Sequence, residues 1–113
     1  MAVANASVNI FKTITVTVGL TTTAIYTAPV AYTGVVLLAQ VANTSDTTKI
    51  ISFGYRRNGE DTPIVKNLPV PGNDTVNLLS GKLVVETGNT LTIVGSTATD
   101  LKYISSILET SNL

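Results

Sequence analysis

Apolar and polar residues alternate over much of this chain, most regularly near its start. From Val8 to Val18 the even positions, apart from Lys12, hold apolar residues (Val8, Ile10, Ile14, Val16 and Val18), and Thr13, Thr15 and Thr17 lie between them. A period of two is typical of a β-strand with one buried face and one exposed face. Lys12 interrupts the apolar face, which indicates a bulge or an edge strand.

The segment 35–41, VVLLAQV, is apolar on both alternating sets of positions. This pattern predicts a central strand that protein covers on both sides. Either another layer of the same domain or a neighbouring subunit can supply the second cover.

A hairpin is predicted around Asn58-Gly59, the preferred pair for a two-residue type I′ turn. In that register Arg57 faces Glu60 and Arg56 faces Asp61, so both cross-strand pairs carry opposite charges. The hairpin therefore explains all four charges better than a basic patch does.

The stretch 68–92 reads as strand, kink, strand, turn, strand. Pro69 and Pro71 hold the backbone extended, and glycines at 72, 81 and 88 mark breaks and turns. Leu101, Tyr103 and Ile107 predict a last strand that ends near Glu109. No long segment has the three-and-four spacing of apolar residues that an amphipathic helix requires.

These patterns predict an all-β fold without substantial helix. About eight strands, with turn signals about every eight to twelve residues, favour an antiparallel β-sandwich of the jelly-roll or immunoglobulin-like type. We expect an N-terminal arm at residues 1–7, one domain at 8–109 and a short tail at 110–113. The predicted core contains Val16, Leu37, Phe53, Leu78, Leu91 and Ile93.

Composition then narrows the function classes. The chain has 113 residues, a formal net charge of zero and only 12% charged residues, against about 25% in a typical soluble domain. So few charges favour a protein that works within an assembly over a neutral, threonine-rich domain that is simply soluble. The absence of a basic excess argues against nucleic-acid binding, and residues 35–42 are too few to span a bilayer.

The residue types offer little chemistry. With no histidine and no cysteine, the commonest general base and the thiolate metal ligands are missing. We therefore expect no enzymatic activity, no catalytic residues, no cofactor and no metal. Asp46 and Asp74 could contribute to calcium binding, but they read better as turn residues because the characteristic calcium loop is absent. For a sugar-binding surface, Tyr32 is the one aromatic ring expected to be exposed.

The order of the turn and core motifs resembles a known group of proteins. The motifs are IYTAP at 25–29, VVL at 35–37 with QVAN at 40–43, LPVP at 68–71, LLSGKLVVETGNTL at 78–91, and ILE at 107–109. Together they are similar to small virion structural proteins of tailed bacteriophages, including marine and cyanobacterial phages, over residues 24–109. Gly88-Asn89 stands where that group usually has glycine-aspartate, which keeps the turn chemistry.

The resemblance implies a β-sandwich subunit without catalytic residues, used repeatedly on a virion that assembles in the host cytoplasm. We expect a capsid decoration or cement protein that acts through protein-protein contacts. A neck, tail or baseplate accessory subunit and a sugar-binding host-attachment module are the alternatives. The expected partners are capsid, neck or tail proteins and further copies of the chain, in a homo-oligomer for which a trimer is one form. The candidate interface comprises Val3, Val8, Phe11, Thr13, Thr15, Thr17 and Tyr32.

Overall fold

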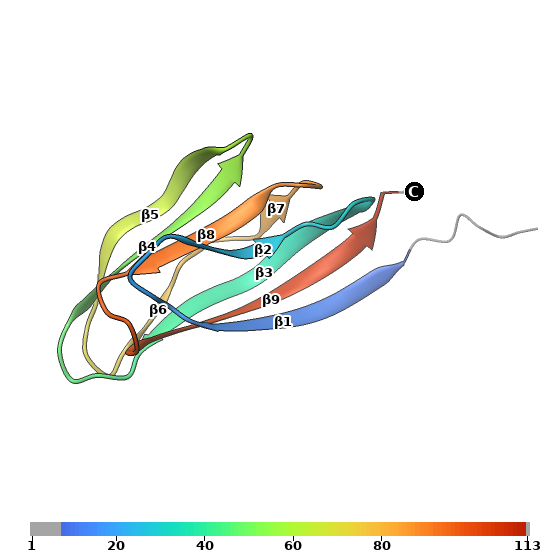
Figure 1. Ribbon diagram of the computed structural model, residues 1–113. Coiled ribbons are helices and arrows are strands. Elements are labelled where there is room, and N and C mark those ends of the chain that lie inside the picture. Colours follow the sequence, from blue (N-terminus) through green and yellow to red (C-terminus); the bar gives the residue numbers. More distant parts are fainter. Residues whose placement is uncertain (1–7, 113) are drawn as a thin grey trace, which may run out of the picture.

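Nine strands in two antiparallel sheets form the fold (Figure 1), seen in a computed structural model that describes residues 8–112. The predicted all-β sandwich is confirmed, and the described residues include no helix that could cross a membrane. The arm expected at residues 1–7 lies outside the described residues. The strands are β1 (Asn9–Thr17), β2 (Thr23–Thr27), β3 (Tyr32–Asn43), β4 (Lys49–Arg57), β5 (Glu60–Val70), β6 (Thr75–Asn77), β7 (Leu83–Val85), β8 (Thr90–Gly95) and β9 (Leu101–Ser111).

The strand order is that of a jelly roll. One sheet has the order β1-β9-β3-β6, with β7 also paired to β3, and the other has the order β2-β8-β4-β5. Most consecutive strands lie in opposite sheets, and β4-β5 is a hairpin within one sheet. This Greek-key arrangement is that of a jelly roll, one of the two sandwich types expected from the sequence. β6 and β7 both pair with the same side of β3, at different residues along it. The nine strands therefore occupy eight positions in the two sheets, the number of strands expected from the sequence.

The core lies between the sheets, where Phe53 and Tyr103 pack with ring centroids 5.8 Å apart. Four of the predicted core residues are confirmed as buried: Phe53, Leu78, Leu91 and Ile93. Val16 is half-buried and packs against this core.

The prediction that Leu37 is buried is wrong, because its exposed fraction is 39%. The register between β3 and β9 shifts between Val36 and Leu38, so β3 contains an extra residue there. The bulge turns both Leu37 and Leu38 outward, while Val36 and Ala39 stay in the core.

The strand at 35–41 is central, as predicted, since β3 lies between β9 on one side and β6 and β7 on the other. The described residues cover only one of its faces. Of the two covers considered from the sequence, residues 8–112 supply no second layer over the outward face, which holds Leu37 and Leu38 at 39% exposure each.

The hairpin is confirmed. Asn58 and Gly59 have φ of 52° and 77°, and the register pairs Arg56 with Asp61 and Arg57 with Glu60. The Arg56 Nε donates to Asp61 Oδ1 at 2.6 Å, which raises the pKa of Arg56 and lowers that of Asp61. The Arg57 side chain instead pairs with Glu86, the residue directly after β7.

Candidate protein-protein interface

Several exposed apolar side chains lie on the solvent side of the β1-β9-β3 sheet, here called the outer face. The strand registers place Phe11, Leu108, Val35 and Val84 in one row across β1, β9, β3 and β7. Phe11 is 75% exposed and Val84 is 52% exposed. A row of this kind across four strands exposes more contiguous apolar surface than scattered single residues do.

The β3 bulge extends this row along the sheet. Leu37 and Leu38 follow Val35 on β3, and Leu38 lies opposite Ser106 of β9. Ile104 of β9, which is 40% exposed, lies two residues further along, opposite Gln40. The apolar part of the outer face therefore consists of the Phe11 row and the two leucines of β3, with Ile104 beyond them among polar residues.

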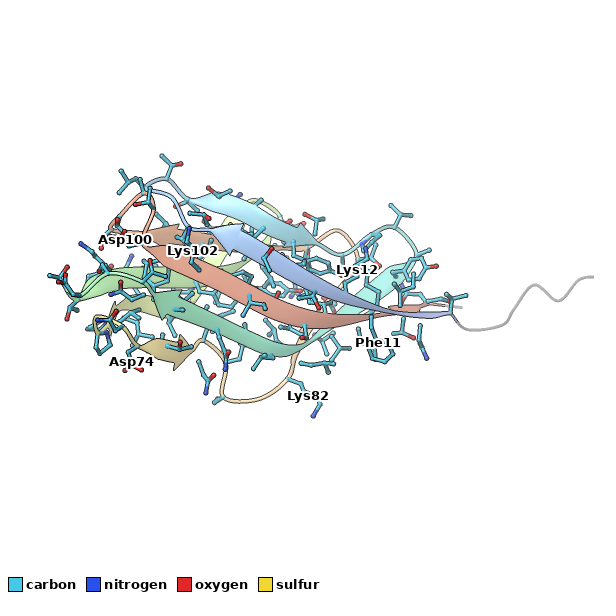
Figure 2. The ribbon with its side chains drawn as sticks, turned by 90° about the horizontal axis from the view of Figure 1, so that it is seen from below. Phe11, Lys12, Asp74, Lys82, Asp100 and Lys102 are labelled. Atoms are coloured by element: carbon cyan, nitrogen blue, oxygen red, sulfur yellow. The ribbon has the colours of Figure 1, made fainter. Side chains whose placement is uncertain are left out.

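Hydroxyl and amide groups fill the other half of the outer face. Thr13, Thr15 and Thr17 alternate along β1 and are exposed, as the sequence pattern predicts. Gln40 Nε2 donates to Asn77 Oδ1 at 2.9 Å across β3 and β6. Lys102 is the one charged residue at the outward positions of the described strands of this sheet, and its Nζ lies 3.2 Å from Thr17 Oγ1. Figure 2 shows Phe11 and Lys102 toward opposite ends of the face.

The structure brings together four residues of the predicted interface: Phe11, Thr13, Thr15 and Thr17. Val8 is 45% exposed, but it precedes β1 and belongs to the even-numbered, inward set of positions. Tyr32 is half-buried at the start of β3, where its carbonyl accepts a hydrogen bond from Thr87. Val3 lies outside the described residues.

Val84, Ile104 and Leu108 were not among the predicted interface residues, because their place on the face depends on the pairing of strands far apart in the chain. Ile104 and Leu108 lie at even positions, whereas the inward residues Leu101, Tyr103 and Ile107 lie at odd positions. That offset was the available signal that β9 also has an apolar outward side.

An ion pair between an exposed lysine and a buried carboxylate ties β1 to the rest of the fold. Glu109 of β9 is 1% exposed, and it accepts a hydrogen bond from the Tyr26 hydroxyl at 2.7 Å while Lys12 Nζ lies 3.0 Å from its other oxygen. Burial, and then the hydrogen bond to Glu109, raise the pKa of Tyr26 well above its usual value. Lys12 thus interrupts the apolar side of β1 because it neutralises a buried carboxylate, and β1 is indeed an edge strand.

Gly34 of β3 makes room for this network. A Cβ atom at position 34 would lie 2.5 Å from the Tyr26 hydroxyl oxygen and 2.9 Å from its ring. Tyr26 comes from the β2-β8-β4-β5 sheet and Glu109 from the opposite sheet, so the hydrogen bond joins the two layers.

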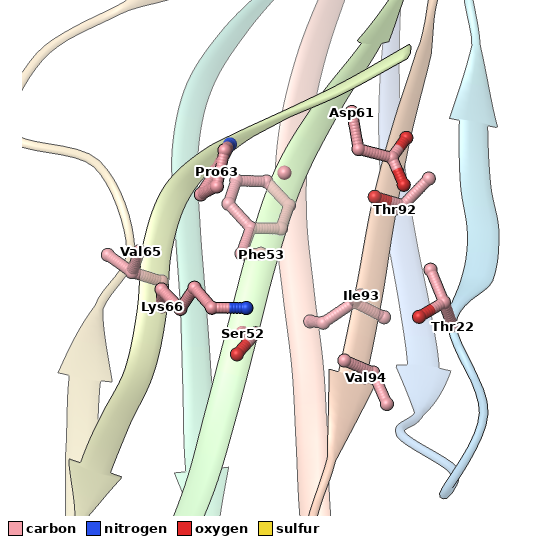
Figure 3. A pocket seen from close by; sticks show the side chains of 11 residues that line it. Thr22, Ser52, Phe53, Asp61, Pro63, Val65, Lys66, Thr92, Ile93 and Val94 are labelled. Carbon is pink, nitrogen blue, oxygen red and sulfur yellow. The ribbon is translucent and has the colours of Figure 1, made fainter. Parts of the chain in front are cut away.

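A small pocket lies on the solvent side of the other sheet, over Phe53 and Gly54 (Figure 3), with a volume of about 130 Å³. Figure 3 shows Asp61 beside Thr92 and Lys66 extended over Ser52. Asp61 is already held by two hydrogen bonds from Arg56. The pocket offers no exposed aromatic platform for a sugar, since Phe53 is 1% exposed. Within the described residues, no three carboxylates gather in a way that could hold a metal ion.

Comparison with known proteins supports the fold. No protein-family model and no curated protein sequence matches the chain. Among solved structures, a chain from Bacillus endospore appendages, a family of disulfide-linked pili, is similar over 98% of this chain and 96% of its own, with a TM-score of 0.58 and 16% identity. A chain from the acid-stable capsid structure of the Helicobacter pylori bacteriophage KHP30 is similar over 96% of this chain and 94% of its own, with a TM-score of 0.56 and 12% identity. Both likenesses extend over nearly the whole sandwich.

Proposed function

We propose that this chain is a non-enzymatic structural subunit of a bacteriophage virion, and that it decorates the capsid through contacts made by the outer face. The observation that carries the proposal is the outer face itself. The outward positions of its described strands hold one charged residue, Lys102, while Phe11 and Val84 are more than half exposed. An apolar surface of this kind on a small soluble domain is typical of a protein-protein contact.

The size of the face fits this role. Four strand positions about 4.8 Å apart and about nine residues long cover roughly 600 Å². Burying that area against an equal area of a partner removes roughly 1,200 Å² from solvent, which is within the range of specific interfaces.

The comparisons add support without assigning a partner. One neighbour belongs to a phage capsid structure and the other to pili, and both are assemblies of many subunits. The resemblance to tailed-phage virion proteins in the turn and core motifs points in the same direction. The marine or cyanobacterial type, the position on the virion and a trimeric state remain predictions.

Copy number tests the proposal. Mass spectrometry of purified virions is expected to find hundreds of copies if the chain decorates the shell. About six to eighteen copies would instead support the neck, tail or baseplate alternative, because those parts have closed cyclic symmetry. Absence of the chain from purified virions would contradict a structural role on the particle.

A further inference from the structure

The exposed edges of the two sheets differ in how well they are protected against pairing with another strand. β5 contains Pro63 and Pro69 and has two register shifts against β4. β2 has five residues and a register shift, and β6 and β7 have three residues each. Short length, proline and bulges are the features by which sheets avoid edge-to-edge pairing.

β1 has none of these features. It has nine residues without proline or glycine, and it pairs with β9 without a register shift. Its one charge, Lys12, points inward and lies 3.0 Å from the Glu109 carboxylate. An inward lysine can protect an edge, but here a buried carboxylate neutralises it.

In the part of the chain that the structure describes, no strand pairs with the backbone of β1 on its open side. At the two ends of the pairing, Val18 N–H donates to the Leu101 carbonyl at 2.9 Å and Ser111 N–H donates to the Val8 carbonyl at 3.0 Å. Because bonded and non-bonded pairs alternate in an antiparallel ladder, the even positions of β1 bond to β9. The odd positions therefore turn N–H and C=O toward the open edge: Asn9, Phe11, Thr13, Thr15 and Thr17.

We propose that β1 pairs antiparallel with β1 of a second copy of this chain, about a two-fold axis at Thr13. The two outer faces then become one continuous surface. This inference rests on the proposed function as an assembly subunit, and it names the partner at one edge of the fold.

The strand is complementary to itself in this register. Thr13 lies opposite the partner's Thr13, and Phe11 lies opposite the partner's Thr15, an aromatic pair with a β-branched residue that is favourable across strands. In this pairing each odd-numbered residue donates one backbone hydrogen bond to the partner strand and accepts one from it. Lys12 lies opposite the partner's Ile14, so the two ammonium groups do not face each other. A two-fold axis at Lys12 would place them directly opposite.

A cross-linking experiment tests the register in the full-length chain. The chain has no cysteine, so a single introduced cysteine can bond only to its own copy in the partner. In Thr13→Cys the two Cα atoms are expected about 5.5 Å apart, within disulfide range. In the control Thr17→Cys they are about 27 Å apart, eight residues at about 3.4 Å each. We expect a disulfide dimer of twice the 11.8 kDa chain mass from Thr13→Cys, and at least tenfold less from Thr17→Cys.

A proline variant tests the backbone contact. Thr15→Pro removes an N–H that faces the open edge and leaves the β1-β9 ladder intact, so it should still fold and should sediment as a monomer. Thr15→Val keeps the N–H and should remain a dimer. A wild-type monomer or trimer at high concentration, or equal cross-linking at both cysteines, would overturn the inference. Loss of the dimer when residues 1–7 are deleted would also overturn it, because the dimer contact would then depend on those residues and not on β1 alone.

The outcomes separate this inference from the proposed function. A chain that stays monomeric but is present on purified virions contradicts only the β1 pairing. A dimer that never occurs on virions contradicts only the virion role.

Discussion

At the scale of single residues, a buried carboxylate explains several features of the sequence. Glu109 is 1% exposed and is matched by the Lys12 ammonium and the Tyr26 hydroxyl. A buried charge is tolerable only when it is paired and hydrogen-bonded. Lys12 on the inward side of β1, Tyr26 of β2 and Gly34, which leaves room for the Tyr26 ring, are therefore parts of one arrangement.

Gly34→Ala should destabilise the fold by about 1–3 kcal/mol, the range for overpacking a tight site. The added methyl group would lie 2.5 Å from the Tyr26 hydroxyl oxygen. Urea unfolding of the variant measures the loss. The double variant with Tyr26→Phe removes the nearest clashing atom, so its loss should be smaller than the sum of the two single losses; full additivity would contradict the contact.

The pH dependence of stability provides a second residue-scale prediction. Because the pKa of Tyr26 is raised in the folded state, the unfolded chain ionises first as the pH passes the usual value of about 10. The free energy of unfolding should therefore carry no Tyr26 contribution to its pH dependence below about pH 9 and decline above about pH 10.

Denaturant unfolding between pH 8 and pH 11 checks this, with Tyr26→Phe expected to show a shallower decline than the parent. Tyr32→Phe is the matched control, since the Tyr32 hydroxyl takes no part in the Glu109 network. Identical declines in the parent and Tyr26→Phe would contradict the prediction.

At the scale of elements, the structure depends on one bulge and one hairpin. The bulge in β3 turns two successive leucines toward solvent and so creates part of the outer face. The hairpin at Asn58-Gly59 fixes the register of β4 and β5.

Leu37→Ala should cost about 1 kcal/mol or less, because the side chain is 39% exposed and loses little burial. Ile93→Ala is the matched comparison, since Ile93 is 1% exposed in the core and should cost about 2–5 kcal/mol. Chemical denaturation of both variants measures the difference. Equal losses would contradict the outward position of Leu37.

Gly59→Val should destabilise the chain by about 1–3 kcal/mol, because a β-branched residue opposes the positive φ of 77° at this position. Gly81→Val is the control. No atom lies within 4 Å of a Cβ built at either glycine, but Gly81 does not have positive φ. Thermal unfolding should separate the two variants, and an unaffected Gly59→Val would rule out the strained turn.

Sequence alone predicted what local patterns determine. The Asn58-Gly59 turn, the alternation along β1 and the central position of β3 follow from neighbouring residues. The outward position of Leu37 could not be predicted, because the bulge is set by the register of β3 against β9. The row of Phe11 with Val84 and the bond from Tyr26 to Glu109 depend on pairing and packing between distant segments, which no periodicity reveals.

At the scale of the whole molecule, the two sheets present different surfaces. The outward strand positions of the β1-β9-β3 side carry aliphatic and hydroxyl groups with the one charge of Lys102, whereas the other side carries the Arg56-Asp61 ion pair and Lys66. The two sides thus differ in charge, and the side with fewer charges is the one proposed to contact a protein partner.

The proposed virion role depends most directly on this difference, and Phe11→Asp tests it. Phe11 is 75% exposed, so the change should leave the melting temperature nearly unchanged while placing a charge within the proposed contact. Leu20→Asp is the matched control, since Leu20 is 62% exposed in the turn between β1 and β2, away from the outer face.

The decisive measurement is the occupancy of each variant on purified virions at dilute protein concentration. We expect Phe11→Asp to lose at least tenfold in occupancy, while Leu20→Asp stays within twofold of the parent. Full occupancy of a correctly folded Phe11→Asp would contradict attachment through the outer face.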